Sequence, residues 1–257
     1  MPKYKNNYIY EMICEVRFST ILKINNDSSE ELSKLQDKLK KCFPIYNQVN
    51  KNQYNLKINQ DNENNLPQIF TKNNKSHIFL SEDNKMKVLL TSNYISLVTC
   101  DYSDFKTYKE KFQYVIKCFN QVFKINNFNR VGIRYVNTFS KEEFDIEDNS
   151  EWNRYFINEI LGLTIKKKNI RVFNNNIEIP FDDKSQTRII SGFGERKQED
   201  SGVTPVFILD MDTYIVNNIM YDDLISKVDS LHNHNSEIFE SLITDKLRNK
   251  MGVIKDE

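Results

Sequence analysis

The sequence predicts an α+β protein in which helices pack on one face of a twisted antiparallel sheet and two helices close the C-terminal end. Several segments alternate apolar and polar residues, as half-buried strands do, and others repeat apolar residues at helical spacing. Short turns separate the strand-like segments, so neighbouring strands should pair antiparallel, because a parallel crossover is much longer. The 257 residues fit a single unit, with loosely duplicated halves, 1–139 and 140–257, as a further option.

The first predicted element is a strand over residues 8–18. Its alternation places every second residue from Tyr8 onward, Tyr10 included, on one buried face. Leucines at helical spacing then predict a helix that Pro44 ends. Residues 53–99 alternate in short runs and predict a meander of strands, in which the stretch 67–71 is the weakest and a candidate edge.

The strongest helix signal begins at Asp104, a residue type suited to capping a helix N-terminus. A long apolar stripe follows from Phe105 to Phe123, so this helix should cross the sheet and anchor the core. Residues 130–139 alternate again and predict a further strand.

The second half of the sequence has a similar rhythm. Ser150 is expected to cap a helix that Gly162 ends. Two helices are predicted at the C-terminal end, beginning near Tyr221 and near Ser236. Three strands are predicted between the helix that Gly162 ends and the helix that begins near Tyr221. They lie near residues 163–173, 187–193 and 203–216.

The composition excludes several classes of protein. With 36 basic and 36 acidic residues, no overall attraction to nucleic acid or anionic membranes is expected, and the basic run Lys166–Lys168 with Arg171 is better explained as a protected strand edge. The sequence has no signal-peptide core and no run long enough to span a membrane, which predicts a cytoplasmic protein. Four cysteines, none in a C-x-x-C pair, should be buried thiols in a reducing compartment.

Nucleotide-binding and catalytic signatures are absent: the sequence has no Walker A motif, no dinucleotide-binding glycine motif, no nucleophile elbow and no H-E-x-x-H. We therefore expect no cofactor and assign no catalytic residue. The alternative is a metal-dependent hydrolase or nuclease that uses Asp210, Asp212 and His232. The two aspartates alternate on a predicted strand, so both carboxylates face one side and could hold a divalent cation. A structural interpretation explains the same residues: the aspartates are solvated acids, and the histidine lies at a helix C-terminus, where its charged form interacts favourably with the helix dipole.

Residues 129–137, N-R-V-G-I-R-Y-V-N, contain the candidate partner-binding residues Arg134, Tyr135 and Asn137. Alternation places Arg134 on one face of the strand and Tyr135 with Asn137 on the other. Arg134 could pair with an acid of a partner, but we prefer a cross-strand ion pair that holds the two halves together. Candidate interface anchors are found among Tyr8, Tyr10, Tyr94, Tyr102 and Tyr135.

A series of short motifs extends along nearly the whole chain. These motifs are residues 11–18, 129–137, 207–212 (F-I-L-D-M-D), 231–232 and 238–244. The series resembles a sporadically distributed, uncharacterised family of bacterial proteins of about this length, which is known as a sequence profile and has no assigned biochemistry to carry over. Sporadic distribution implies horizontally transferred genes, and so hints at conflict systems such as defence against phage or toxin neutralisation.

Together these observations predict a non-enzymatic protein-binding module, acting as a sensor, inhibitor or accessory subunit of a bacterial conflict or antiphage system. Its partner is expected to be another protein that is encoded nearby. Nucleic acid and membranes are not expected partners, and the sequence gives no oligomeric state.

Overall fold

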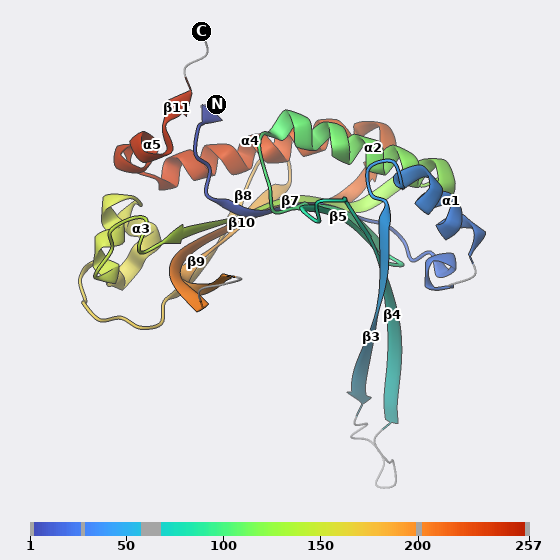
Figure 1. The fold of residues 1–257 in the computed structure, drawn as a ribbon, viewed down its shortest axis with the longest axis horizontal. Helices are drawn as coiled ribbons and strands as arrows, with labels where there is room; N and C mark the ends of the chain where they lie inside the picture. The colour runs from blue at the N-terminus through green and yellow to red at the C-terminus, as the bar shows by residue number, and fades with distance from the viewer. Residues whose placement is uncertain (1–2, 27–28, 58–67, 199–201, 255–257) are drawn as a thin grey trace.

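The computed structural model describes residues 3–26, 29–57, 68–198 and 202–254, which form a nine-stranded antiparallel sheet with helices on one face (Figure 1). This confirms the predicted α+β class. The strand order is β3-β4-β5-β6-β2-β7-β10-β9-β8. The strands of this sheet are β2 (Ile9–Arg17), β3 (Ile45–Lys57), β4 (Gln68–Leu80), β5 (Met86–Leu90), β6 (Tyr94–Thr99), β7 (Asn127–Ser140), β8 (Asn174–Pro180), β9 (Ser185–Gln198) and β10 (Gly202–Met220).

Five α-helices are formed by the described residues. They are α1 (Glu30–Leu39), α2 (Phe105–Phe123), α3 (Asn158–Leu161), α4 (Leu224–Leu242) and α5 (Asp245–Met251). Short 3-10 helices are η1 (Leu22–Asn25), η2 (Asn149–Arg154), η3 (Gly162–Ile165) and η4 (Tyr221–Asp223). Two further strands, β1 (Lys3–Tyr4) and β11 (Val253–Ile254), pair with each other as a separate two-stranded sheet.

The described chain forms two units of related topology, in which the first meander has four strands and the second has three. In each, a first strand leads to a helical segment, then to a meander whose last strand returns to pair with the first, and finally to a long helix on the sheet. The first strands, β2 and β7, pair antiparallel at the centre of the sheet. The second unit therefore begins with β7, whereas the sequence placed this strand at the end of a first half 1–139.

The helices form where the sequence predicted an apolar face and a cap. The Asp104 carboxylate accepts the Thr107 amide at 2.9 Å and begins α2, as expected. The Ser29 hydroxyl begins α1 in the same way, by accepting the Leu32 amide. Phe112 and Phe119 of α2 are fully buried, so this helix anchors the core of the first unit.

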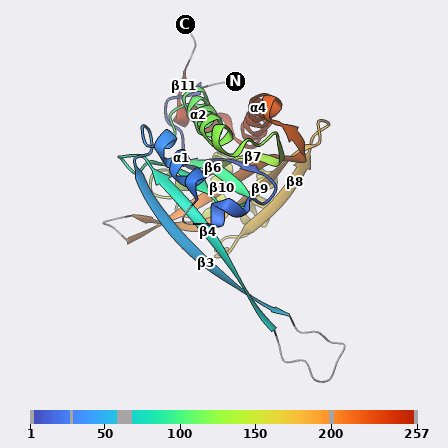
Figure 2. The ribbon, with the colours of Figure 1, turned by 90° about the vertical axis from the view of Figure 1, so that its right-hand side faces the viewer.

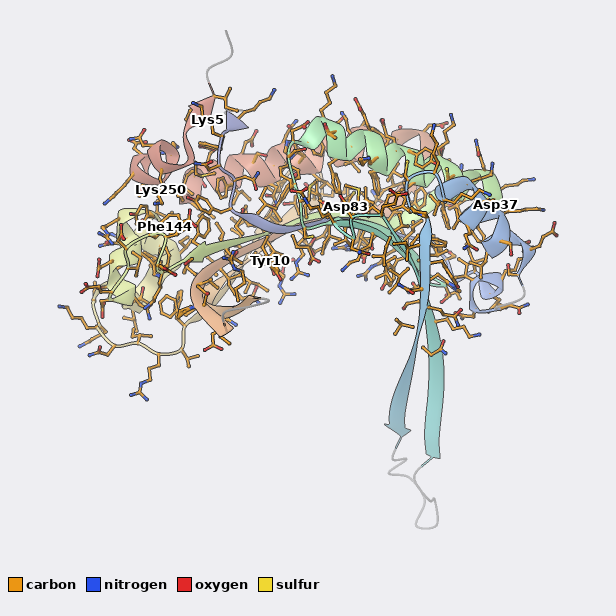
Figure 3. All side chains as sticks on the ribbon, viewed as in Figure 1. Lys5, Tyr10, Asp37, Asp83, Phe144 and Lys250 are labelled. Atoms are coloured by element: carbon orange, nitrogen blue, oxygen red, sulfur yellow. The ribbon has the colours of Figure 1, made fainter. Side chains whose placement is uncertain are left out.

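A bulge interrupts the predicted alternation of β2. Ile9 pairs with Asn137 and Glu11 with Val136, so Tyr10 is the extra residue of this strand. Beyond the bulge, Met12 and the alternate residues that follow it are fully buried, as predicted. Tyr10 is instead 51% exposed, so the prediction that it shares the buried face is wrong (Figure 3).

The meander of the first unit has longer strands than its sequence suggests. β3 begins directly after Pro44, and the weak strand predicted at 67–71 is the start of a longer strand, β4, which continues to Leu80. Pro67 itself lies outside the described residues. β3 and β4 pair along their whole length, and their hairpin extends well beyond the rest of the sheet (Figures 1 and 2).

The helix predicted between Ser150 and Gly162 is broken into shorter pieces. Asp148, not Ser150, caps η2 through a reciprocal interaction with Glu151. Gly162 ends α3 with a φ of +54°. The strand predicted at 163–173 is also wrong: η3 and a loop occupy it, and the edge of β9 is taken by β8. The basic run Lys166–Lys168 therefore lies in a loop and not on a strand edge.

The two C-terminal helices are present, but the break between them lies later than predicted. α4 continues through Ser236 to Leu242, and Thr244 then caps α5. The polar stretch before Ser236 does not end the helix because Asn235 is buried and bonded: its Nδ2 donates to the Met211 carbonyl at 3.1 Å and to the Thr213 hydroxyl at 2.9 Å, both on β10.

Two apolar cores fill the space between the helices and the sheet. The first contains Phe112 and packs mainly under α1 and α2, and the second contains Phe156 and packs around α3, α5 and the end of α4. Side chains crowd this layer, whereas no helix of the described chain covers the opposite face of the sheet (Figure 3). Polar and aromatic residues separate the two cores, and the candidate site lies there.

Candidate functional site

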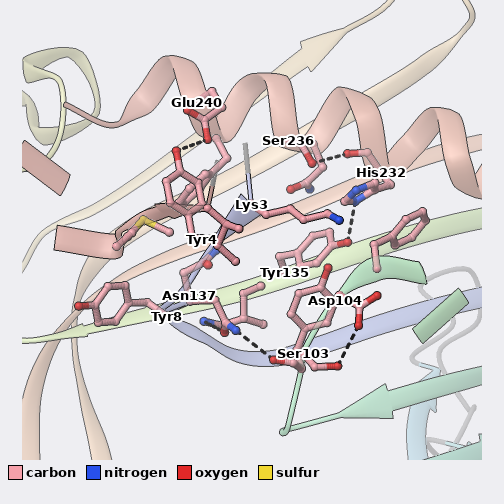
Figure 4. Close-up of a pocket in the computed structure, with 18 of the residues that line it drawn as sticks. Lys3, Tyr4, Tyr8, Ser103, Asp104, Tyr135, Asn137, His232, Ser236 and Glu240 are labelled. Carbon is pink, nitrogen blue, oxygen red and sulfur yellow. Dashed lines mark hydrogen bonds between the residues drawn. The ribbon is translucent and has the colours of Figure 1, made fainter. Parts of the chain in front are cut away.

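A cavity of about 540 Å³ lies between the start of α2, the middle of α4 and the central strands (Figure 4). It lies where the two units meet, because α2 belongs to the first unit and α4 to the second. Six aromatic residues other than histidine dominate its wall: Tyr4, Tyr8, Tyr102, Phe105, Tyr135 and Phe239.

Side chains from three parts of the chain meet on the floor of the cavity. The Tyr135 hydroxyl of β7 lies 2.8 Å from Nδ1 of His232 on α4. The Tyr102 ring meets the Tyr135 ring edge to face, with centroids 5.8 Å apart. The imidazole of His232 stacks on the Phe105 ring at 3.7 Å, which holds it in place. We call these three contacting side chains, Tyr102, Tyr135 and His232, the Tyr–Tyr–His chain.

All three groups are uncharged at neutral pH. Burial lowers the pKa of His232 from its usual 6.5 to about 4, so the imidazole is neutral. Burial raises the pKa of Tyr102 to about 12 and that of Tyr135 well above its usual value, so both phenols keep their protons. The chain thus offers neutral donors and acceptors rather than a charged or strongly basic group.

The remaining wall is held by contacts to the backbone and by one carboxylate. Asn7 Nδ2 donates to the Tyr102 carbonyl at 3.0 Å and ties the N-terminal segment to the loop before α2. Asn137 is buried, and its Nδ2 donates to the Leu209 carbonyl at 3.1 Å. Near the mouth, the Tyr4 hydroxyl donates to Glu240 on α4 at 2.6 Å.

Both ends of the described chain close one side of the cavity. β1 and β11 pair antiparallel, and Lys3 and Tyr4 of β1 line the cavity together with Ile254 of β11. The pairing continues as the Lys5 amide donates to the Gly252 carbonyl at 2.9 Å. Gly252 has a φ of +70°, a left-handed conformation that glycine adopts without strain, and it turns the chain from α5 into β11. We call this two-stranded element the terminal strap.

Charged residues form a network on the opposite, uncovered face of the sheet. Arg134 Nε donates to Asp210 at 2.7 Å, and a second bond joins the same guanidinium and carboxylate. Arg130 contacts Asp212 at 2.9 Å and Glu15 at 3.2 Å. The predicted cross-strand ion pair of Arg134 is therefore present, but it lies within the second unit. On this face Arg130 with Glu15 joins the two units, and on the helical side Lys109 of α2 pairs with Asp229 of α4 at 2.7 Å.

The structure separates the three residues of the alternative metal site. Asp210 and Asp212 lie on the face that pairs with arginines, whereas His232 lies over the other face and contacts Tyr135. No group of three or more His, Cys, Asp or Glu side chains in the described part of the chain could hold a metal ion. We do not carry the metal-dependent alternative further.

The three candidate partner-binding residues are also separated. Arg134 lies on the uncovered face, whereas Tyr135 and Asn137 are only 6% and 4% exposed and line the cavity. A protein partner could reach the latter two only by entering the cavity. Their predicted faces are confirmed, and we assign Tyr135 and Asn137 to the pocket.

Sequence reasoning found only part of the cavity. It singled out His232, and it noted Tyr8 and Tyr102 as candidate anchors, but it did not bring these residues together. Phe105 was assigned to the apolar stripe of its helix. Asn7 was missed because a polar residue directly before an apolar strand gives no local signal of a cavity. Strand pairing and the placement of α4 bring them together.

A second histidine, His234, has a structural role. Its Nδ1 lies 3.0 Å from the Ser185 hydroxyl, and its ring stacks on Phe181 at 4.0 Å. The Asp183 carboxylate bonds to Ser185 rather than to the histidine, and Ser185 is 2% exposed. The geometry is not that of a Ser–His–Asp triad, in which the acid orients the histidine. These residues fasten the β8–β9 turn to α4.

No family model matches this chain, and no curated protein matches its sequence. Within the described ranges, no helix is both long and apolar enough to cross a membrane.

The neutral state of His232 predicts a pH-dependent stability. Its folded pKa of about 4 lies below the usual 6.5, so the unfolded chain binds a proton that the folded chain excludes between these values. Stability is therefore full above pH 6.5 and is lost as pH falls toward 4. Between pH 7 and 4 the wild type should lose about 2 kcal/mol more free energy of unfolding than His232→Gln. Urea unfolding at both pH values measures this, and parallel losses in the two proteins would contradict it.

Proposed function

We propose that this chain is a non-enzymatic binding protein that holds a small molecule in the cavity between its two units and reports on it to a protein partner. The Tyr–Tyr–His chain carries the proposal, because it places neutral hydrogen-bonding groups on the floor of an aromatic cavity. Small-molecule sites are typically concave, mostly apolar and roughly 300–1,000 Å³ in volume, with a few fixed polar groups. The cavity, at about 540 Å³, is of this kind.

The protonation states favour binding over catalysis. A general base works best when its pKa lies near the working pH, and the pKa of His232 is about 4. Nucleophilic catalysis needs an activated group, whereas the pKa of Tyr135 is raised by burial, which makes the phenolate harder to form. The cavity therefore offers neutral hydrogen-bond donors and acceptors, which suit the recognition of a bound molecule.

The wider role in this proposal rests on the sequence. The motif series favours a sensor, inhibitor or accessory subunit of a bacterial conflict system, with a partner protein encoded nearby. A sensor needs a ligand site and a route to its partner, and the cavity provides the former. The four cysteines are free, with Cys100 exposed, which fits a reducing compartment. We accordingly place the protein in the cytoplasm.

A fragment screen with two matched variants tests the ligand site. Ser236 lines the cavity, and among the described residues its hydroxyl bonds only to the His232 carbonyl of its own helix, so Ser236→Phe should fill the cavity without breaking the fold. Glu237→Phe places the same ring on the exposed side of α4. We expect fragments found by ligand-observed NMR to bind the wild type and Glu237→Phe, and to bind Ser236→Phe at least about 10-fold more weakly.

Two outcomes would contradict the ligand site. Fragments that bind Ser236→Phe as tightly as the wild type would occupy another surface. An absence of any saturable binding to the folded wild type would leave the cavity without a ligand role. Thermal unfolding of both variants, followed by circular dichroism, shows that the comparison is between folded proteins.

The protein partner needs a separate experiment. The chain is co-expressed with each protein encoded next to it, and the mixtures are separated by size-exclusion chromatography. We expect one neighbour to co-elute in a fixed ratio with this chain. Elution of the chain apart from every neighbour, both with and without a cavity ligand, would contradict the proposed partner.

A further inference from the structure

The acidic and basic side chains around the cavity differ in whether they have partners within the protein. Four charged residues line it: Lys3, Asp104, Lys106 and Glu240. Asp104 caps α2 and accepts both the amide and the hydroxyl of Thr107, at 2.9 and 2.8 Å. Its charge thus faces the positive end of the helix dipole. Glu240 accepts the Tyr4 hydroxyl at 2.6 Å and lies 3.1 Å from Nε of Arg248. Both acids therefore have compensating partners within the protein.

The two lysines have no such partners. Neither Lys3 nor Lys106 has an ion-pair partner among the residues that the structure describes. Lys3 lies on β1 of the terminal strap, and Lys106 lies in the first turn of α2. Figure 4 shows the Lys3 side chain extending across the cavity toward the side on which Tyr135 and His232 lie. The cavity wall therefore carries two lysines without an ion-pair partner among the described residues, whereas the Tyr–Tyr–His chain is neutral.

From this division we propose that the cavity binds a molecule with a planar aromatic or heteroaromatic ring and an anionic group. The ring lies among the aromatic side chains, and its polar edge meets Tyr135 and His232. The anionic group, a carboxylate or a phosphate, contacts Lys3 and Lys106 on the cavity wall. This inference rests on the proposed function, since it names the ligand class of the same cavity.

Aromatic side chains favour a ring, because stacked and edge-to-face contacts between rings stabilise beyond the area they bury. The lysines favour an anion through point-charge attraction at a partly solvated site, where each such contact contributes little by itself. Together the two lysines should make an acid bind about 10-fold more tightly than its neutral amide.

Matched pairs of probes test the inference. The pairs are 2-naphthoate with 2-naphthamide and 4-hydroxybenzoate with 4-hydroxybenzamide, and acetate and inorganic phosphate are the ring-free probes. Binding is measured by NMR titration at low salt to the wild type and to the double variant Lys3→Gln/Lys106→Gln. The double variant Lys111→Gln/Lys117→Gln is the control, because it removes the same charge from exposed positions of α2 outside the cavity.

We expect each acid to bind the wild type and the control variant about 10-fold more tightly than its amide, and to bind Lys3→Gln/Lys106→Gln with less than about 3-fold preference. The ring-free anions should bind far more weakly than either ring compound. Amides that bind as tightly as the acids, or an acid preference that survives in Lys3→Gln/Lys106→Gln, would overturn the ligand class and leave the cavity as a binding site. The proposed function itself fails only if the fragment screen also finds no binding that Ser236→Phe weakens.

Discussion

Replacing Phe156 with alanine is expected to lower the free energy of unfolding by about 3–5 kcal/mol. The ring is fully buried in the second core and packs against Phe139 and Phe207, with centroid distances of 4.9 and 4.7 Å. The backbone of Phe156 bridges Ile243, at the break between α4 and α5, so the surrounding chain is held from several sides. A site held in this way cannot collapse onto the cavity that the smaller side chain leaves.

Urea unfolding measured with two probes tests this expectation. The single tryptophan, Trp152, belongs to the same core, so its fluorescence reports on the second unit, whereas circular dichroism reports on both. Because β2 and β7 pair at the centre of one sheet, we expect both probes to show a single shared transition. Val172→Ala, at a site that is 87% exposed, should change stability by less than about 0.5 kcal/mol. A loss for Phe156→Ala as small as this control would contradict the predicted packing.

Replacing Arg130 with methionine is expected to cost about 3 kcal/mol at pH 7, because it removes a nearly buried guanidinium that two partly buried acids share. The Arg130 side chain is 13% exposed and contacts both Asp212 and Glu15. Its guanidinium also lies 4.5 Å from the Tyr214 ring centroid. Gly132 makes room for it, since a Cβ there would lie 2.7 Å from the guanidinium.

The cost of Arg130→Met should be smaller at low pH. Burial raises the pKa of Asp212, and Arg130 and Arg134 oppose this shift. Without Arg130, the folded-state pKa rises further above the unfolded value, so protonation of Asp212 in the folded state relieves part of the cost as pH falls through it. We expect a smaller difference between wild type and variant at pH 5 than at pH 7 in urea unfolding. An equal difference would contradict this account.

The control is Arg17→Met. Arg17 bonds the same Glu15 at 2.7 Å, but its side chain is 50% exposed. Exposed ion pairs contribute little, so the variant should lose less than about 1 kcal/mol. Equal losses from Arg17→Met and Arg130→Met would show that burial does not set the strength of this network.

Sequence patterns predicted those parts of the fold that depend on residues close together in the sequence. The Asp104 cap, the stripe of α2 and the separate faces of Arg134 and Tyr135 follow from periodicity and capping chemistry, which short segments carry by themselves. The bulge at Tyr10 could not be predicted, because it depends on how β2 pairs with β7. The continuity of α4 likewise depends on β10, which supplies the acceptors for the buried Asn235.

The candidate site was less predictable than the fold. Its floor combines Tyr102, Tyr135 and His232, which come from a loop, a strand and a helix that are far apart in sequence. Each residue has an ordinary local explanation, so only the strand order and the path of α4 show that they meet. The neutral state of His232 is a property of its burial and has no signature in the sequence.

The pairing of β1 with β11 also bears on how the chain could be rearranged. Residues 3–4 and 253–254 lie side by side, and the segment between α2 and β7 links two units of related topology. A circular permutant that is cut within residues 124–126 and joined across its old ends would place the second unit first and retain every strand pair of the sheet. The order in which the two units are synthesised is therefore separable from the architecture that they build.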